Sequence, residues 1–454
     1  MELNSLRDFL ITHLIERILP FWLERGIDWD NGGFFTCFNN LGDKLVSKNK
    51  YVWSEGRFLW VLSHLYRHFR DMFPQTKLEK LEGGAKLGAE FLRDHAILDD
   101  GSCAWLLTER GLPVEYKGDV DGEHSMNRHP AHLGIEADEF LIYGFVEFSV
   151  AFDKPEYFRL ACDIYRGVVD RIESGKFFSA PYGVPTGYRS HGIPMLLLET
   201  TREMIEGASY WKDPFLSELV EIGFRVAEES VVPFRCNERR ILVEMVKSDG
   251  GIAPDEMIGS YYNPGHTLEH AWFLIDFARE VERLSGGGVR NGLGNKPSGE
   301  ATLFDANKWK SEGLRLIDWM VEKCWDNEFG GIPQFLHVDW GAPRGRVLEV
   351  NADDKILGYL RNHWDKKLWW VHSEALYALL LAYRLTGDND YWNYYLKVHD
   401  YTFGTFPNSD EKIGEWIQIR RRDGTPVNDV VALPVKDPFH IMRALMFMIK
   451  LLNT

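Results

Sequence analysis

Two histidines, far apart in the chain, each stand at the start of an amphipathic helical pattern. His266 lies in NPGHTLEHAWFLI and His440 lies in KDPFHIMRALMFM, and both follow residues that break helices. A charged residue comes three positions later in each segment, Glu269 and Arg443, on the same helix face. Because imidazole takes up and releases protons near neutral pH, the two segments predict a proton-transfer site made of two opposed bases. Helix capping or packing is the alternative for each histidine.

Two further charged residues lie in strongly apolar surroundings. Glu374 follows a pair of tryptophans in KKLWWVHSEALYALL, and Arg57 lies at an aromatic helix start in YVWSEGRFLW. A carboxylate is costly to bury unless it is paired or functional, and an arginine in such a place commonly holds an oxyanion or a carboxylate. The alternative is a structural ion pair, with Lys366 or Lys367 for Glu374 and with Glu55 or Glu24 for Arg57.

The helical patterns that carry these residues recur with a regular spacing. Linkers rich in glycine and aromatic residues resemble one another: DNGGFFTCFNNLGDKL, DDGSCAWLLTERGLPV, DNEFGGIPQFLHVDWGAP and GEWIQIRRRDGTPV, with KFFSAPYGVPTG and SDGGIAP as weaker members. They recur every ~70 to 85 residues. Hydrophobic periodicity predicts twelve helices, over residues 4–25, 53–70, 77–96, 136–152, 155–174, 191–209, 213–231, 267–285, 302–324, 371–386, 388–404 and 438–453.

A sixfold repeat of helix, turn, helix and hairpin predicts an all-α fold, the (α/α)6 barrel. Six helical hairpins would form an inner and an outer ring in a single domain over residues 1–454, with short β-hairpins at the active-site rim. The helix after each hairpin is expected in the inner ring, so that the first turns of the inner helices converge on one pocket. The candidates there are Trp53, Arg57, Glu139, His191, His266, Glu269, Trp370, His372, Glu374, His440 and Arg443.

The sixteen tryptophans are a weaker signal. Several, among them Trp53 and Trp370, lie near the proposed rim. Indole rings stack on the apolar faces of sugars, although aromatic residues at helical spacing more often belong to a hydrophobic core. We therefore expect a sugar-binding contribution from Trp53 and Trp370 only in combination with the polar residues around them.

The composition argues against several classes of protein. The net charge is −16, with acidic residues spread along the chain, which disfavours nucleic acid or an anionic membrane as a partner. The five cysteines are scattered without a CxxC pair, and the first twenty residues are charged and amphipathic. We therefore expect reduced thiols, no signal peptide and a cytoplasmic protein. No apolar run approaches the length of a bilayer span.

No cofactor or metal is expected either. The chain has no phosphate-binding GxxxxGKS/T pattern and no dinucleotide-binding GxGxxG pattern after a strand. His124, His129 and His132, with Glu136 beyond them, form the densest histidine cluster, but their spacing matches no structural zinc site. We expect this segment to be a polar loop over the mouth of the pocket.

Six segments follow one another along nearly the whole chain: DNGGFFTCF, KYVWSEGRFLW, NPGHTLEHAWFL, KLWWVHSEAL, GEWIQIRRRDG and PFHIMRAL. In this order they resemble the N-acylglucosamine 2-epimerase family, also called renin-binding proteins in animals, whose relatives include cellobiose 2-epimerases and aldose-ketose isomerases. NPGHTLE and KLWWVHSEA favour the N-acylglucosamine branch. The resemblance implies an acid/base pair of His266 and His440, with Arg57, Glu269 and Glu374 as supporting groups and His372 and Arg443 lining the same pocket.

The expected activity is a cofactor-independent inversion at C2 of a sugar, between an N-acylglucosamine and an N-acylmannosamine or between free hexoses, through an enediolate. An aldose-ketose isomerase of the same family is the nearest alternative. A glycoside hydrolase or lyase on an (α/α)6 barrel and a non-catalytic binding protein are the others. The resemblance also implies a homodimer, and the nucleotide effector of some relatives has no support in this sequence.

Overall fold

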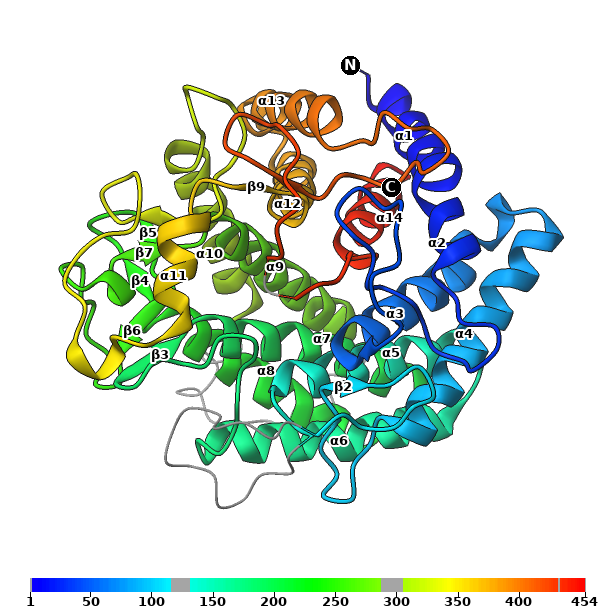
Figure 1. Cartoon of the computed structure of the whole chain (residues 1–454). Helices are drawn as coiled ribbons and strands as arrows, with labels where there is room; N and C mark the ends of the chain where they lie inside the picture. The colour runs from blue at the N-terminus through cyan, green and yellow to red at the C-terminus, as the bar shows by residue number, and fades with distance from the viewer. Residues whose placement is uncertain (1, 116–130, 287–304, 432, 454) are drawn as a thin grey trace. The chain divides into compact units, whose positions relative to one another are not determined.

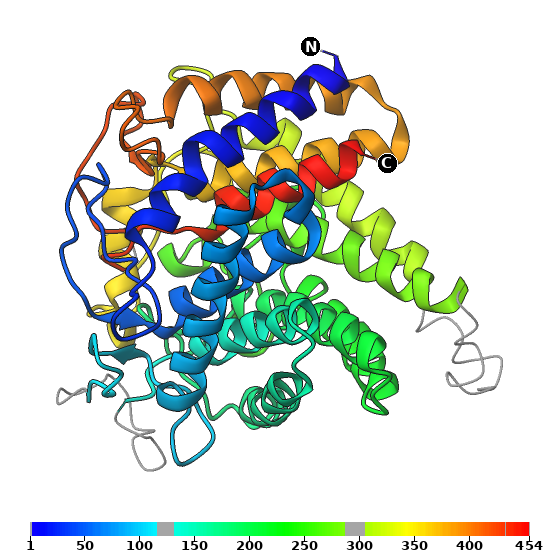
Figure 2. The same cartoon turned by 90° about the vertical axis from the view of Figure 1, so that its right-hand side faces the viewer.

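The computed structural model describes residues 2–115, 131–286, 305–431 and 433–453. They form two compact units, the first drawn from residues 1–183, 407–417 and 428–453 and the second from residues 184–406 and 418–427. Figures 1 and 2 show the chain from two directions. The single domain expected over residues 1–454 stays a prediction.

The first unit contains seven labelled α-helices among the described residues. These are α1 (Leu3–Thr12), α2 (Leu19–Arg25), α3 (Val52–Phe69), α4 (Gln75–His95), α5 (Ile135–Ala151), α6 (Pro155–Glu173) and α14 (Phe439–Leu452), with a π-helical stretch, His13–Ile18, between α1 and α2. Helices α3, α5 and α14 are buried on almost all faces, whereas α4 and α6 each bury one apolar stripe. Helix α3 packs against α4, α5 and α14, and α5 packs against α6. This is the division into inner and outer helices that the repeat predicts.

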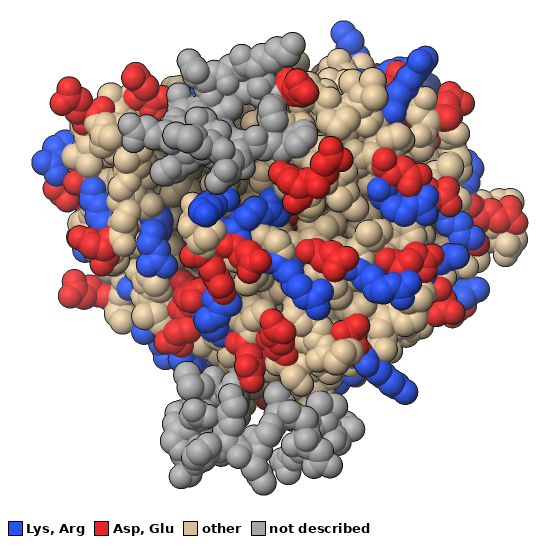
Figure 3. All heavy atoms as spheres, turned by 90° about the horizontal axis from the view of Figure 1, so that it is seen from below, with Lys and Arg blue, Asp and Glu red and all other residues tan. Residues whose placement is uncertain are grey.

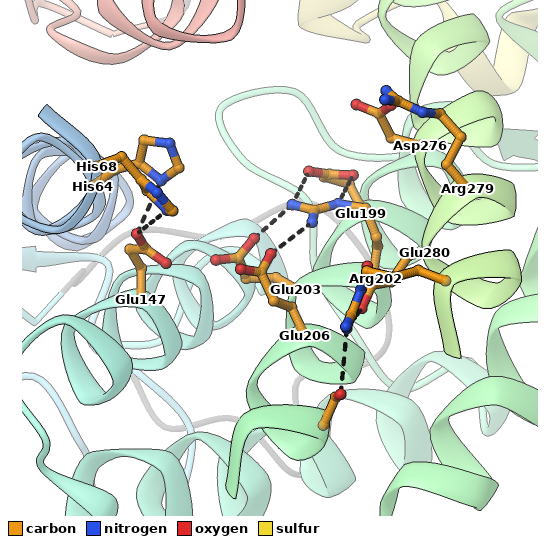
Figure 4. A network of polar contacts seen from close by, with 12 residues as sticks. His64, His68, Glu147, Glu199, Arg202, Glu203, Glu206, Asp276, Arg279 and Glu280 are labelled. Atoms are coloured by element: carbon orange, nitrogen blue, oxygen red, sulfur yellow. Dashed lines mark hydrogen bonds and ion pairs between the residues drawn. The ribbon is translucent and has the colours of Figure 1, made fainter. Parts of the chain in front are cut away.

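Helices α3 and α5 cross at a pair of glycines. A Cβ atom built on Gly56 would lie 2.2 Å from the carbonyl oxygen of Phe140, and one on Gly144 would lie 2.5 Å from the carbonyl oxygen of Gly56. Glycine therefore allows the two backbones to touch. Two turns further along α3, Nδ1 of His64 lies 2.9 Å from Oε1 of Glu147, so a buried hydrogen bond also joins α3 to α5 (Figure 4).

The second unit repeats the pattern of paired helices. Its helices are α7 (Gly192–Trp211), α8 (Leu216–Val231), α9 (Pro264–Gly286), α10 (Ala306–Lys323), α11 (Lys355–His363), α12 (Trp369–Thr386) and α13 (Asn389–Thr405). Helix α9 packs against α7, α10 and α12, and α13 packs against α12. Along α7, Arg202 bonds to Glu199 and Glu203 one turn and one residue away (Figure 4). The inner helices of this unit thus follow one another as α7, α9 and α12.

Four helix pairs are bracketed by a two-stranded antiparallel sheet. A strand directly before the first helix of each pair bonds to a strand after the second: β1 (Lys50–Tyr51) with β2 (Leu106–Leu107), β3 (Tyr188–Ser190) with β6 (Met245–Lys247), β7 (Tyr261–Tyr262) with β8 (Leu336–His337), and β9 (Lys367–Leu368) with β10 (Ile419–Arg420). Only β4 (Arg235–Cys236) and β5 (Ile241–Leu242), among the named strands, form a hairpin within one linker. The expected rim hairpins are therefore mostly sheets that join two successive linkers.

The predicted helices agree with the structure except at two places. Helix α11 was missed because it lies inside a long linker, and the predicted helix over residues 4–25 is divided by the π-helical stretch. None of the helices in the described part of the chain is both long and apolar enough to cross a bilayer. On the face shown in Figure 3, Lys and Arg side chains lie interspersed with Asp and Glu, so the acidic excess is not gathered in one patch there.

The glycine crossing gives a test of the fold. Gly56→Ala should lower the free energy of unfolding by ~2 kcal/mol or more, because the new methyl group meets backbone atoms that cannot turn aside. Gly167→Ala on α6 is the matched control, since its Cβ would meet only the end of the Arg171 side chain, at 4.0 Å. The control should leave stability unchanged or raise it by up to ~1 kcal/mol through helix propensity. Urea denaturation of both variants measures the difference, and equal stabilities would contradict the close crossing.

Candidate active site

The second unit presents His266 on the first turn of α9. Strand β7 ends at Tyr262, and the side-chain oxygen of Asn263 then accepts a hydrogen bond from the backbone N–H of His266 at 3.3 Å. Pro264 occupies the first helical position, where an N–H would have no acceptor within the helix. The strand and the cap together fix where the His266 side chain begins. Its ring lies beside the indole of Trp370, with ring centroids 5.3 Å apart.

The His266 ring is bonded to a carboxylate that the sequence did not single out. Nδ1 of His266 lies 2.8 Å from Oε1 of Glu244, which stands between β5 and β6. The His266 side chain is 30% exposed and that of Glu244 is 7% exposed. One signal could have found Glu244: it is the single acidic residue in the apolar run ILVEMV, where a carboxylate needs a partner.

This contact changes the protonation of both groups. Burial by itself would lower the pKa of His266, but the charge of Glu244, its hydrogen bond and the charge of Glu269 raise that pKa above the usual value of 6.5. Burial would raise the pKa of Glu244, whereas His266 and His191 hold it well below the usual range. Glu244 is therefore ionised at neutral pH, and His266 is a stronger base than a free imidazole.

Two of the predicted carboxylates lie close together in the same unit. Glu269 is one turn after His266 on α9, and Glu374 is on α12, which packs against α9. Carboxylate oxygens of the two residues lie within 4.8 Å of each other. Oε2 of Glu374 accepts a hydrogen bond from the indole N–H of Trp272 at 2.7 Å. Both carboxylates are buried, so α9 and α12 bring them into one polar cluster.

The lysines beside Glu374 were the structural alternative for this carboxylate. Nζ of Lys367 lies 2.9 Å from Oδ2 of Asp326, and both side chains are almost fully buried. Burial, opposed by Asp326, lowers the pKa of Lys367 to about 8. Lys367 therefore forms its ion pair with Asp326, in the linker before β9. The suggested ion pair between Lys367 and Glu374 is wrong.

His372 has both ring nitrogens bonded to the backbone. Nε2 accepts from the N–H of Ile332 at 3.0 Å, which leaves the proton on Nδ1, and Nδ1 lies 2.7 Å from the carbonyl oxygen of Leu368. Burial lowers the pKa of His372 to about 3, so the ring is neutral. This geometry favours a structural role for His372, joining α12 to the linker before it, over contact with a substrate.

The first unit presents His440 at the start of α14. Oδ2 of Asp437 accepts a hydrogen bond from the backbone N–H of His440 at 3.0 Å and so caps the helix. A guanidinium nitrogen of Arg443, one turn later, lies 3.5 Å from Nδ1 of His440. A cation beside Nδ1 disfavours a proton there, so the neutral ring carries its proton on Nε2. All three side chains are buried.

Arg57 and Trp53 lie on α3 in the same unit as His440. The guanidinium of Arg57 is 3.5 Å from Oδ1 of Asp437, the residue that caps α14. It also lies over the rings of Trp53, Phe140 and Phe439, at 4.4, 3.9 and 5.3 Å from their centroids. Asp437 is thus a partner of Arg57 that the sequence did not indicate. The indole N–H of Trp53 is buried and has no acceptor among the described residues.

Glu139, another rim candidate, lies on α5 in the first unit. Neither of its carboxylate oxygens has a hydrogen-bond partner within the described part of the chain. Burial, with the nearby charges of Glu136 and Asp138, raises the pKa of Glu139 well above its usual value. Burial therefore favours the neutral form of Glu139, whereas the two histidines favour the ionised form of Glu244.

The histidine-rich loop is described only in part. Its last histidine, His132, lies 2.8 Å from Asp138, and Glu136 accepts a hydrogen bond from the Ser179 hydroxyl. These contacts hold the start of α5. His124 and His129 lie outside the described residues, so the loop over the pocket mouth stays a prediction.

The predicted residues thus fall into two groups, one in each unit. The second unit brings together His266, Trp370 and the Glu269–Glu374 cluster, and adds Glu244. In the first unit, Arg57 and His440 share Asp437 as a partner, with Trp53 and Arg443 beside them. Each group holds one histidine on the first turn of an inner helix, with charged side chains beside it.

Comparison with known proteins gives a consistent result. Residues 301–444 match the family model for N-acylglucosamine 2-epimerase. The chain is 27% identical to the N-acylglucosamine 2-epimerase of Rattus norvegicus over 95% of its own length and 88% of the relative. It is 27% identical to the cellobiose 2-epimerase of Bacteroides fragilis over 92% of each chain. Its fold matches the solved structure of cellobiose 2-epimerase from Bacillus thermoamylovorans, with a TM-score of 0.71 at 16% identity, over 98% of this chain and 99% of the other.

The likeness to solved structures confirms the (α/α)6-barrel fold that the repeat predicts. The curated relatives are matched along most of both chains. The chain therefore resembles N-acylglucosamine 2-epimerases and cellobiose 2-epimerases, which are isomerase-class enzymes, along most of its length.

Proposed function

We propose that the protein is a cofactor-independent sugar 2-epimerase that interconverts an N-acylglucosamine and an N-acylmannosamine, or the corresponding free hexoses. The relatives support a sugar 2-epimerase. The observation that carries the proposal is His266: its ring is partly exposed, while Nδ1 is bonded to a buried, ionised carboxylate. An imidazole held in this way is suited to remove a proton from carbon.

Inversion at C2 requires an open-chain sugar, because the proton on C2 is acidic only beside a carbonyl group. Removing it yields an enediolate, whose oxygen needs a positive or hydrogen-bonding partner. In our proposal Arg57 supplies that partner. One histidine takes the proton from one face of C2, and the other returns a proton to the opposite face.

The two histidines have different partners at Nδ1, which favour different ring nitrogens for the proton of the neutral ring. The proton of a neutral His266 ring lies on Nδ1, toward Glu244, which leaves a lone pair on Nε2. In a neutral His440 ring the proton lies on Nε2, because the Arg443 guanidinium stands beside Nδ1. In the proposed reaction the neutral His266 ring takes the C2 proton at Nε2 and becomes an imidazolium, while a protonated His440 ring returns a proton to the opposite face and becomes neutral. The reverse reaction exchanges these roles.

The remaining predicted residues have supporting roles in this proposal. Glu269 raises the basicity of His266 through its charge, and Glu374 is held by Trp272 beside Glu269. Trp53, Trp370 and Arg443 are proposed substrate-binding residues, whereas both nitrogens of His372 are already bonded to the backbone. A homodimer and a cytoplasmic location stay predictions.

The alternatives differ in their products. An aldose-ketose isomerase delivers the proton to C1 and yields a ketose. A glycoside hydrolase cuts a glycosidic bond, so oligosaccharides would release new reducing ends, which an epimerase never produces. A pure binding protein would leave every sugar unchanged. Incubation with a panel of aldoses, N-acyl hexosamines and oligosaccharides, read by NMR, separates the four.

His266→Asn and His440→Asn should each lower kcat for epimerisation by about 10²- to 10⁴-fold, because each removes one of the two proton-transfer groups. Both variants should keep the melting temperature of the wild type within a few degrees. His95→Asn is the control, since His95 lies on the last turn of α4 and packs on Phe91. Wild-type rates in both active-site variants would refute the assignment of the bases.

Glu374→Gln should lower kcat by about 10²-fold while leaving the fold intact, since glutamine still accepts the Trp272 hydrogen bond but carries no charge. Arg57→Lys should have a similar effect, because lysine keeps a positive charge near Asp437 but loses the planar guanidinium. Steady-state kinetics and thermal melting are measured together. A large loss of stability with a near-normal kcat would show that these residues are structural.

Epimerisation in D2O should place deuterium at C2 of the product aldose, because the returning proton comes from a histidine that has exchanged with solvent. No ketose should accumulate. A single-base isomerase would instead give ketose as the main early product, with part of the substrate hydrogen retained, since the same histidine removes and donates the proton. Early ketose together with an active His440→Asn variant would contradict the two-base mechanism.

A further inference from the structure

A line of buried polar side chains begins at Glu244 and leads away from His266. Oε2 of Glu244 faces Nδ1 of His191 at 3.8 Å. Nε2 of His191 lies 2.9 Å from Nδ1 of His270, and Nε2 of His270 lies 2.9 Å from the Ser230 hydroxyl. The line therefore runs from a partly exposed imidazole to the outer helix α8, entirely within the second unit.

The five residues lie in four parts of the second unit. Glu244 lies between β5 and β6, His191 lies just before α7, His266 and His270 lie on α9, and Ser230 lies on α8. Glu244 is fixed by its backbone, whose N–H donates to the carbonyl of Tyr261 at 3.0 Å and whose carbonyl accepts from the N–H of His191 at 2.9 Å. His266 and His270 lie one turn apart on α9. The Glu244 carboxylate thus stands between two imidazoles, His266 on one side and His191 on the other, without relying on a flexible loop.

We propose that Glu244 is a positioning residue that acts through His266: it holds the imidazole with the proton on Nδ1 and leaves Nε2 as the atom that exchanges a proton with the substrate. His191, whose other ring nitrogen is bonded to His270, faces the second carboxylate oxygen. This inference rests on the proposed epimerase function and adds to it a residue that the catalytic histidine depends on.

The geometry favours this role over an ordinary structural contact. A carboxylate in this position gives up most of its hydration, and it does so beside a ring that stays 30% exposed. Nε2 of His266 has no hydrogen-bond partner among the described residues, while Nδ1 has a short one. A carboxylate that only packed the linker would not need to face His266, which is the partly exposed histidine of α9.

The charged groups around His266 act in the same direction. The ring faces Glu244 and Glu269, both of which favour its protonated form, and His191 and His270 lie beyond Glu244. Burial, with the nearby charges of His191 and His266, lowers the pKa of His270 well below 6.5, so His270 is a neutral member of this line. Removing the charge of Glu244 should therefore lower the pKa of His266, since Glu269 alone would then oppose burial.

The first experiment reads the histidine directly and needs no substrate. The full-length protein is labelled with ¹⁵N-histidine, and His266 is assigned by the signal lost in His266→Asn. In the wild type its neutral form should carry the proton on Nδ1 and titrate above pH 6.5. In Glu244→Gln the titration should move to lower pH by about one unit or more. A wild-type ring protonated on Nε2 would overturn the proposal, even if no variant could be purified.

The second experiment measures catalysis. Glu244→Gln should lower kcat by about 10²-fold with little change in KM, because the charge that stabilises the imidazolium is lost while substrate contacts remain. The acid limb of the kcat/KM profile should shift to lower pH together with the pKa of His266. Exchange of the C2 hydrogen in D2O should be slowed for the epimer served by His266 and retained for the epimer served by His440.

A matched control separates this role from general damage to the unit. Glu256 is another buried carboxylate of a linker, bonded to Lys247, Tyr188 and Arg346 and not to any of the five residues above. Glu256→Gln should leave the His266 titration and kcat unchanged. A wild-type kcat and titration in Glu244→Gln would refute the role of Glu244. A wild type that epimerises no sugar would refute the proposed function instead, while the NMR result would still stand.

Discussion

A short strand stands directly before the inner helices α3, α7, α9 and α12, and the position of every side chain on their first turns depends on how that strand is held. Each strand bonds to a partner that follows the next outer helix, so the sheet closes around a helix pair. A two-stranded sheet of this length would be unstable in isolation. Here the packed helix pair between the two strands holds them together. The sheet therefore fixes the start of the helix rather than the fold as a whole.

A buried lysine strengthens this closure in two of the repeats. Lys50 of β1 bonds to Asp28 at 2.8 Å, and Lys367 of β9 bonds to Asp326 at 2.9 Å. Each aspartate also accepts from backbone N–H groups two and three residues later, which shapes the glycine-rich turn that follows. The same ion pair in two linkers is a structural trace of the sequence repeat. Because all four side chains are buried, removing either aspartate would leave a buried lysine without its carboxylate partner.

The polar groups near the two histidines follow one rule: each buried charge has a partner that sets its state. Glu244 keeps His266 basic, and Asp437 both caps α14 and pairs with Arg57. Glu139 has no such partner among the described residues, and burial raises its pKa well above the usual value. The chemistry proposed for His266 therefore depends on the low polarity around it as much as on the residue itself, since burial strengthens the effect of one nearby carboxylate.

The sequence by itself determined the helices, their period and the residues on the first turns, because these depend on neighbours a few positions apart. It also carried the resemblance to N-acylglucosamine 2-epimerases, since NPGHTLE and KLWWVHSEA are local strings. Only the tertiary structure decided the partners: Glu244 for His266, Asp437 for Arg57 and Asp326 for Lys367. These pairs join residues from 22 to 380 positions apart, and His372 turned out to be bonded to backbone on both sides. Spacing along a helix cannot reveal which distant side chain fills the space beside it, because that choice is made by how the linkers pack.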